Sequence, residues 1–267
     1  MFKNVYPLFE RKRLLKKEML ENIRDFPRDI VDIFFQDYSD GILAGCDIKV
    51  KESYLFIGAG ILYRKGIPYV MNEPYKLPYK ATGKTQYIKV RFLDEIEGTE
   101  QKESLTQIYI NDIPAQDKDE LELGRFKLQE GARLRDQYTD FFDYATEFDT
   151  LIKLYLPYAS PKQSTLCPEI IKRYAESLMY YNLQNPWDYA FCFTCMQEEG
   201  AITYSAIKSY LDVRLQQKQE NYSTKEIYDA LAQLLCEAGG KGSAHSSKLS
   251  VGLRGRRGSR CLCPKSM

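Results

Sequence analysis

Residues 54–71 read YLFIGAGILYRKGIPYVM. They hold three short runs of β-branched and aromatic residues, Tyr54–Ile57, Ile61–Tyr63 and Pro68–Met71, separated by glycines and charged residues. Runs of this kind between turn residues are typical of short β-strands joined by tight connections. The same pattern continues on either side, in Ile42–Val50, Gln86–Leu93, Leu105–Ile110 and Leu121–Leu128. We therefore predict an antiparallel β-sandwich or barrel-like domain.

A segment whose apolar residues have the spacing of a helix precedes this β-rich part. From Leu8 to Phe26 the apolar residues fall on one face of a helix and charged residues fill the other side. Pro27 suits the start of a second helix, with Asp25 as its cap. A terminal amphipathic helix has to bury its apolar stripe on its own domain or on a partner, and the sequence leaves both open. The candidate docking face consists of Leu8, Leu15, Met19 and Ile23.

Helical periods return after Gly131. One apolar face is expected over Phe141–Tyr155, and a second helix begins near Pro168. Three further helix starts carry capping residues, namely Asn185 before Pro186, Thr203, and Ser223 with Glu226. The helix after Asn185 is apolar on two faces, so we expect it to be the buried central helix.

Shifts in composition divide the chain into four parts and indicate an α+β fold. We predict an N-terminal helical segment (1–38), an antiparallel β-domain (39–130), an α-helical domain (131–238) and a disordered basic tail (239–267). Seven of the 38 Lys and Arg residues lie in the tail, which has no acidic residue. The remaining 238 residues therefore carry a net charge of −6 and are mildly acidic. The whole chain has 38 basic and 37 acidic residues, a balance that favours neither a nucleic-acid binder nor a membrane-surface protein.

Several residue counts bear on the chemistry. The only histidine is His245, in the tail, so a multi-histidine metal site is excluded. The chain has 7 cysteines and starts with no apolar signal sequence, which predicts free thiols in a reducing compartment. Cys192 and Cys195 form a CxxC inside an apolar helix and are expected to be buried thiols. The 21 tyrosines favour a binding or assembly surface over a catalytic cleft.

Gly83-Lys84-Thr85 resembles the end of a phosphate-binding P-loop. The first glycine of that motif is replaced by Pro78, and the segment lies between two predicted strands instead of before a helix. We therefore predict a polar β-turn, and a helicase or ATPase label would rest on this short match alone. Asp94, Glu95 and Glu97 are interpreted as a solvated turn. We expect no enzyme activity, no metal site and no cofactor.

The chain resembles prophage-encoded proteins from tail and baseplate gene clusters, in which an N-terminal helix precedes a small β-domain. The resemblance is carried by YPLFERKRLLKKEML (6–20), FPRD (26–29), DGILAGC (40–46), GAGILYRKGIPY (58–69) and NPWDYAF (185–191). It implies a non-enzymatic structural or assembly component of a phage tail, baseplate or phage-derived injection apparatus that acts by protein–protein docking.

The implied partners are other tail or baseplate proteins and further copies of the chain, with no membrane and no specific nucleic acid. The implied location is the bacterial cytoplasm before assembly and the phage particle or tail-like apparatus afterwards. Two alternatives stay open. One is a P-loop nucleic-acid-dependent ATPase of the helicase type. The other is a carbohydrate-binding β-module, because tyrosine-rich β surfaces also bind sugars.

Overall fold

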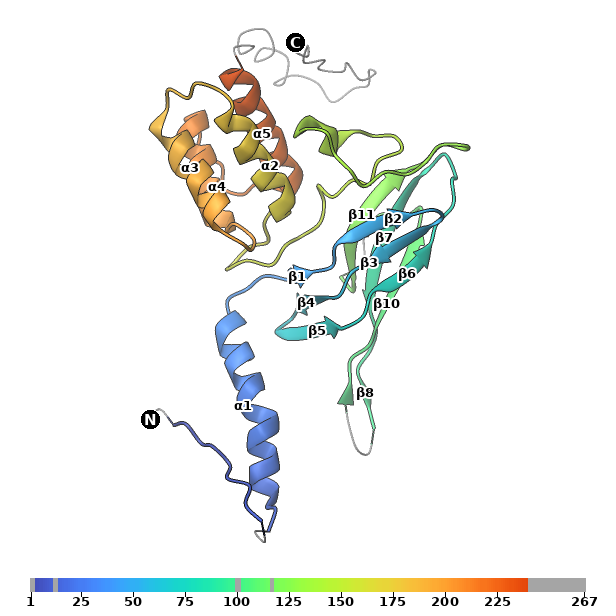
Figure 1. The fold of residues 1–267 in the computed structure, drawn as a ribbon, viewed down its shortest axis with the longest axis vertical. Coiled ribbons are helices and arrows are strands. Elements are labelled where there is room, and N and C mark those ends of the chain that lie inside the picture. Colours follow the sequence, from blue (N-terminus) through green and yellow to red (C-terminus); the bar gives the residue numbers. More distant parts are fainter. Residues whose placement is uncertain (1–2, 12–13, 99–101, 116–117, 240–267) are drawn as a thin grey trace.

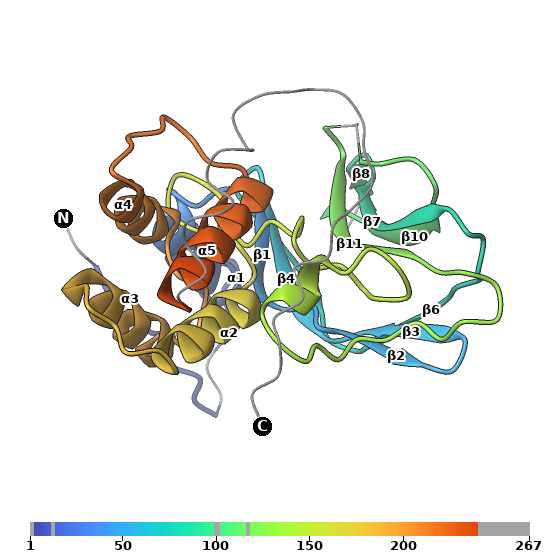
Figure 2. The same cartoon turned by 90° about the horizontal axis from the view of Figure 1, so that it is seen from above.

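The computed structural model describes residues 3–11, 14–98, 102–115 and 118–239 (Figure 1). A long helix, α1 (Lys17–Phe35), leads into a group of small β-sheets, and a cluster of helices follows. Figure 2 shows the later helices gathered on one side of the sheets. The predicted α+β class, with its N-terminal helix, antiparallel β-domain and C-terminal helical domain, is confirmed. The predicted tail, 239–267, lies outside the described residues apart from Gly239.

The named strands pair antiparallel throughout. One sheet has the order β1-β4-β5, a second β2-β3-β6 and a third β10-β7-β11, and β8-β9 is a hairpin. The strands are β1 (Gly41–Gly45), β2 (Ile48–Lys51), β3 (Tyr54–Ile57), β4 (Gly60–Arg64), β5 (Ile67–Met71), β6 (Tyr75–Pro78), β7 (Thr85–Phe92), β8 (Ile96–Glu97), β9 (Lys102–Glu103), β10 (Thr106–Asn111) and β11 (Glu120–Lys127). The predicted strand runs are confirmed, except that Ile42–Val50 forms two strands, β1 and β2, in different sheets. The sequence analysis missed β6, which ends in a proline, and the two-residue strands β8 and β9.

The helical domain consists of α2 (Pro168–Met179), α3 (Pro186–Gln197), α4 (Tyr204–Leu215) and α5 (Thr224–Ala238). The predicted caps are confirmed. Asn185 accepts a hydrogen bond from the Trp187 amide, Thr203 from the Ala206 amide, and Ser223 forms a capping box with Glu226. Each cap satisfies an amide that the first turn of a helix leaves without a partner.

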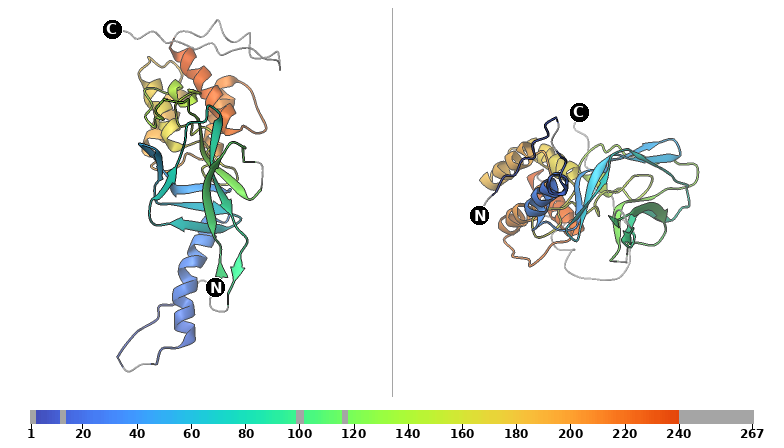
Figure 3. Two further views of the ribbon diagram at one scale, coloured as in Figure 1. Left: turned by 90° about the vertical axis from the view of Figure 1, so that its right-hand side faces the viewer. Right: turned by 90° about the horizontal axis from the view of Figure 1, so that it is seen from below.

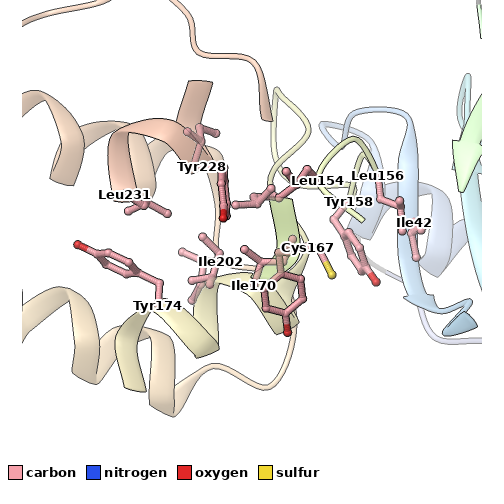
Figure 4. Packing of buried hydrophobic residues seen from close by; sticks show 14 of the residues in the cluster. Ile42, Leu154, Leu156, Tyr158, Cys167, Ile170, Tyr174, Ile202, Tyr228 and Leu231 are labelled. Atoms are coloured by element: carbon pink, nitrogen blue, oxygen red, sulfur yellow. The ribbon is translucent and has the colours of Figure 1, made fainter. Parts of the chain in front are cut away.

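One continuous core joins the helices to the sheets (Figure 4). Tyr174 and Leu231 belong to the helices, Ile42 belongs to β1, and Leu154, Leu156 and Tyr158 lie between them in the chain segment that precedes α2. Nine tyrosines are buried in the described residues. Much of the high tyrosine content therefore fills the core, and the sequence interpretation of tyrosine as surface contact material was wrong for these residues.

The prediction for the N-terminal helix was partly wrong. The helix begins at Lys17, so Leu8 and Leu15 lie outside it. It also continues through Pro27 to Phe35 as one element, where the sequence suggested a new helix. Proline lacks an N–H, so the carbonyl of Ile23 loses its i→i+4 donor. No residue of α1 is buried, so solvent reaches the carbonyls on this helix and the interruption is tolerated.

The helix predicted over Phe141–Tyr155 was also wrong. Only a 3₁₀ turn, η1 (Phe142–Ala145), forms there. Asp143 accepts hydrogen bonds from the Thr139 amide and from the guanidinium of Arg135, which ties the chain into a local loop. Beyond it, Ile152 forms an isolated bridge with Arg125 of β11. Pairing with a distant strand thus replaces the local helical bonds that the apolar spacing suggested.

The structure also overturns the prediction for α3. It is not the central helix, because only one of its faces is covered. Phe191, Cys192 and Cys195 are buried on that face, while Trp187 and Phe193 are more than half exposed. Helix α2 lies against α3 and packs five of its own residues in the core, which are Ile170, Ile171, Tyr174, Ala175 and Leu178.

Candidate docking interface

Helix α1 stands out from the rest of the molecule. Figures 1 and 3 show it extending away from the sheets, on the side opposite the helical domain. None of its 19 residues is buried. Six of its large apolar side chains are exposed by 40–70%, and they are Leu20, Ile23, Phe26, Ile30, Ile33 and Phe34. An apolar face of this size in contact with water is typical of a protein–protein contact surface.

The last turn of α1 is anchored on the β-domain. The Phe35 ring packs edge-on against Tyr38 and lies 6.0 Å from the Tyr63 ring, measured between centroids. The Tyr63 hydroxyl donates a hydrogen bond of 2.9 Å to the Phe35 carbonyl. Next to it, the Lys65 amide donates to the Asp40 carboxylate at 2.8 Å. The end of the helix is therefore held by β4, while the turn that follows β4 binds Asp40 a few residues beyond the helix.

A second set of bonds ties the same region to the chain that leads into the helical domain. The Ser39 amide donates to the Ser160 carbonyl at 3.0 Å, and the Ile42 amide to the Pro157 carbonyl at 2.8 Å. Ser160 in turn accepts a bond from the Tyr204 amide at the start of α4, at 3.3 Å. The C-terminal end of α1 thus lies where the β-domain and the helical domain meet. Contacts with both domains fix the direction of the helix.

Only two of the four residues of the predicted docking face lie on α1. Met19 and Ile23 lie on α1, where Met19 is half-buried and Ile23 is exposed. Leu8 and Leu15 are also exposed, but they precede the helix and do not continue its stripe. The apolar face instead continues toward the C-terminal end of α1, through Phe26 and beyond. Its role in docking stays a prediction.

Gly83-Lys84-Thr85 lies between two strands, as predicted, but it forms an irregular connection between two sheets instead of a β-turn. The segment connects β6 to β7, and no helix follows it. The Gly83 amide bonds the Leu128 carbonyl at 2.9 Å, and the Lys84 ammonium lies 3.8 Å from the Asp112 carboxylate. A P-loop presents successive backbone amides at the start of a helix to its phosphates. This connection has no such helix, so it lacks the geometry of that site.

The other candidate groups also have structural partners. The Lys102 ammonium pairs with Glu95 at 3.2 Å and with Glu97 at 3.6 Å across the β8-β9 hairpin. Cys192 and Cys195 are free and buried, as predicted, and burial raises the pKa of each thiol to about 12. Within the described ranges, no group of three or more His, Cys, Asp or Glu side chains is placed to hold a metal ion.

A cleft of about 290 Å³ lies beside the β4-β5 turn and the end of β7, with Arg64, Tyr69 and Phe92 in its lining. Arg64 is buried, its guanidinium stacks 4.2 Å from the Phe92 ring centroid, and it donates hydrogen bonds to the Lys118 carbonyl and the Asp119 carboxylate. These contacts neutralise the main cation of the cleft. The carbohydrate-binding alternative stays a prediction.

Comparison with known proteins gives a distant likeness in structure only. No family model matches this sequence, and no curated protein matches it. The crystal structure of TssK matches 90% of this chain and 70% of its own, at 8% identity and a TM-score of 0.38. The type VI secretion system TssK-TssF-TssG baseplate subcomplex, determined by cryo-electron microscopy, matches 87% of this chain and 99% of its own, at 8% identity and a TM-score of 0.42. TM-scores this low carry no inference about function.

One exposed surface escaped the sequence analysis. The uncovered face of α3 presents Trp187, Tyr189, Phe193 and Met196, and Tyr180 precedes α3 with 90% of its surface exposed. The signal was present in the sequence, because a helix that is apolar all round can also border two different partners. Among the described residues, no helix combines the length and apolar character needed to cross a membrane.

Proposed function

We propose that this protein is a non-enzymatic assembly component of a phage tail, baseplate or phage-derived injection apparatus, held in place by docking through α1. The observation that carries the proposal is α1 itself, a 19-residue helix with no buried residue and a continuous apolar face. An exposed apolar face of this kind marks a surface where another protein binds. The class of assembly comes from the sequence resemblance to prophage tail and baseplate proteins.

Its partners in this proposal are other proteins of the tail or baseplate, together with further copies of the chain. The protein is made in the bacterial cytoplasm and then enters the assembled particle. The TssK-TssF-TssG subcomplex is also a baseplate structure, but its likeness to this chain is too weak to support the proposal.

The proposal is tested by placing charge on the apolar face of α1. Ile23 and Ile33 are exposed, so Ile23→Glu with Ile33→Glu should leave the melting temperature of the body nearly unchanged. Burying one such side chain contributes about 1.5–3 kcal/mol, so the two substitutions should weaken docking by about a hundredfold or more. The measurement is the amount of protein that co-sediments with tail-like particles from the producing bacterium.

Arg28→Glu is the matched control, because it introduces the same side chain at an exposed position between the two isoleucines in sequence. It should incorporate normally. If the double variant unfolds, α1 belongs to the monomer core and the docking role is wrong. If the double variant folds and still incorporates as well as the wild type, α1 is not the docking element.

A further inference from the structure

The apolar residues of α1 follow a regular spacing. Because the segment is helical, this spacing places them on one face of the helix. Met19, Ile23, Phe26, Ile30 and Ile33 are separated by steps of four, three, four and three residues. These steps are those of positions a and d in a heptad repeat, with Ile23 and Ile30 at a. Leu20 and Phe34 each follow a d position and widen the stripe at position e. A stripe of this form fits the seam between helices that pack nearly parallel or antiparallel.

The helix needs such a partner along most of its length. In proteins, most of the stability of a helix comes from packing of its apolar face and not from helix propensity alone. Proline is the costliest residue inside a helix, and α1 contains Pro27 near its middle. Among the described residues, the ring contact and the hydrogen bond that were given above for α1 both lie in its last turn, at Phe35. Covering the stripe over the preceding turns would offset this cost.

The distribution of charge indicates what covers the stripe. A symmetric contact brings the same surface patch of two identical chains together, so charges of one sign within the patch would be brought close to one another. Positions a, d and e carry no charge between Met19 and Phe34. The charged side chains of α1 lie at the outer positions b, c and f, apart from Asp29 at g, and they are Lys17, Glu18, Glu21, Arg24, Asp25, Arg28 and Asp32. The seam is therefore compatible with a copy of itself.

The available area is sufficient for such an interface. The six large apolar side chains named for α1 are exposed by 40–70%. At about 200 Å² for a large side chain, they offer about 650 Å² per chain, or about 1,300 Å² for two copies. Stable interfaces between proteins bury about 1,200–2,000 Å² in total. Two copies joined through α1 alone thus reach the lower part of that range when all of this exposed area is covered, and the flanking polar residues add to it.

We propose that α1 is the self-association element of this protein, and that its heptad stripe packs against α1 of a second copy. This inference rests on the proposed function, because it names the partner that the docking helix takes. The assembly is a homo-oligomer built around the α1 seam, with the β-domain and helical domain of each copy attached at the C-terminal end of its helix (Figure 3).

The test is the mass of the full-length protein by sedimentation equilibrium at micromolar concentrations. The wild type should give a multiple of 31.1 kDa. Ile23→Glu with Ile30→Glu places charge at both a positions and should return the monomer mass, with the association constant reduced by about a hundredfold or more. Ile23→Leu with Ile30→Leu keeps the seam apolar and should remain oligomeric. Arg28→Glu, at the outer position f, should also remain oligomeric.

A monomeric wild type overturns the self-association, and so does a glutamate variant that stays oligomeric. The docking role is judged separately by particle incorporation. If the wild type is monomeric but the Ile23→Glu with Ile33→Glu variant loses incorporation, the partner of α1 is a different protein, and self-association is wrong while docking stands. If glutamate removes self-association but leaves incorporation unchanged, docking to the apparatus is wrong and self-association stands.

Discussion

Glu120 lies at the centre of a charged cluster on the sheet β10-β7-β11. Replacing it tests how much a buried, paired carboxylate contributes to the stability of the fold. Its side chain is only 6% exposed. It accepts hydrogen bonds from the Lys89 ammonium at 2.8 Å, from the Arg91 guanidinium at 2.7 Å and from the Tyr109 hydroxyl. Burial alone would raise the pKa of Glu120, but these three donors outweigh it and lower the pKa to about 2.

The size of the effect follows from this shift. An unpaired glutamate has a pKa of about 4.5. Because the folded value is lower, the ionised carboxylate stabilises the folded state at pH above about 4.5, and this contribution is lost as the pH falls toward 2. At about 1.4 kcal/mol per pKa unit, the contribution near neutral pH is on the order of 3 kcal/mol. Glu120→Gln keeps the shape and removes the charge, so it should cost up to about that amount.

The assay is urea unfolding of the wild type and of Glu120→Gln at a series of pH values from neutral to acid. Other carboxylates titrate in the same range, so the quantity of interest is the difference between the two proteins. That difference should be largest near pH 7, should shrink below about pH 5 and should nearly vanish at about pH 2. A difference that stays constant with pH, or that grows in acid, would refute the assignment of a charge-dependent role to Glu120.

Four further predictions concern single positions. Gly41→Ala should lower the unfolding free energy by about 2 kcal/mol or more in urea, because a Cβ there would lie 2.6 Å from the Pro157 carbonyl oxygen; an unchanged midpoint would contradict it. Tyr63→Phe should cost about 1 kcal/mol and speed amide exchange in the last turn of α1, since it removes the bond to the Phe35 carbonyl. Lys84→Ala should change stability by no more than about 0.5 kcal/mol, and ATP with Mg²⁺ should not shift the melting temperature of either protein. Cys192 should react slowly with maleimide in the native protein and quickly in urea, because it is buried and its thiol has a raised pKa; fast native labelling would place it at the surface.

Features set by neighbouring residues could be predicted from the sequence. The alternation in Gln86–Leu93 marks a strand because side chains alternate between the two faces of a sheet, and β7 occupies nearly the same residues. The caps at Asn185, Thr203 and Ser223 were also predictable, because each serves an amide two or three positions further along the chain. The place of Gly83 between two strands belongs with them, since its residue types and flanking strands lie within a few positions.

Features that depend on distant parts of the chain were decided by the tertiary structure. Residues 141–155 have helical spacing, but β11 and Arg135 capture their hydrogen-bonding groups, so only η1 remains helical. The two apolar faces of α3 look alike in sequence, yet α2 covers one and leaves Trp187 exposed on the other. For α1, the sequence determined an amphipathic helix, and the fold determined that its anchored end is Phe35 and that its stripe faces solvent. A local pattern specifies which face is apolar, whereas the element that covers that face is placed by contacts far away in the sequence.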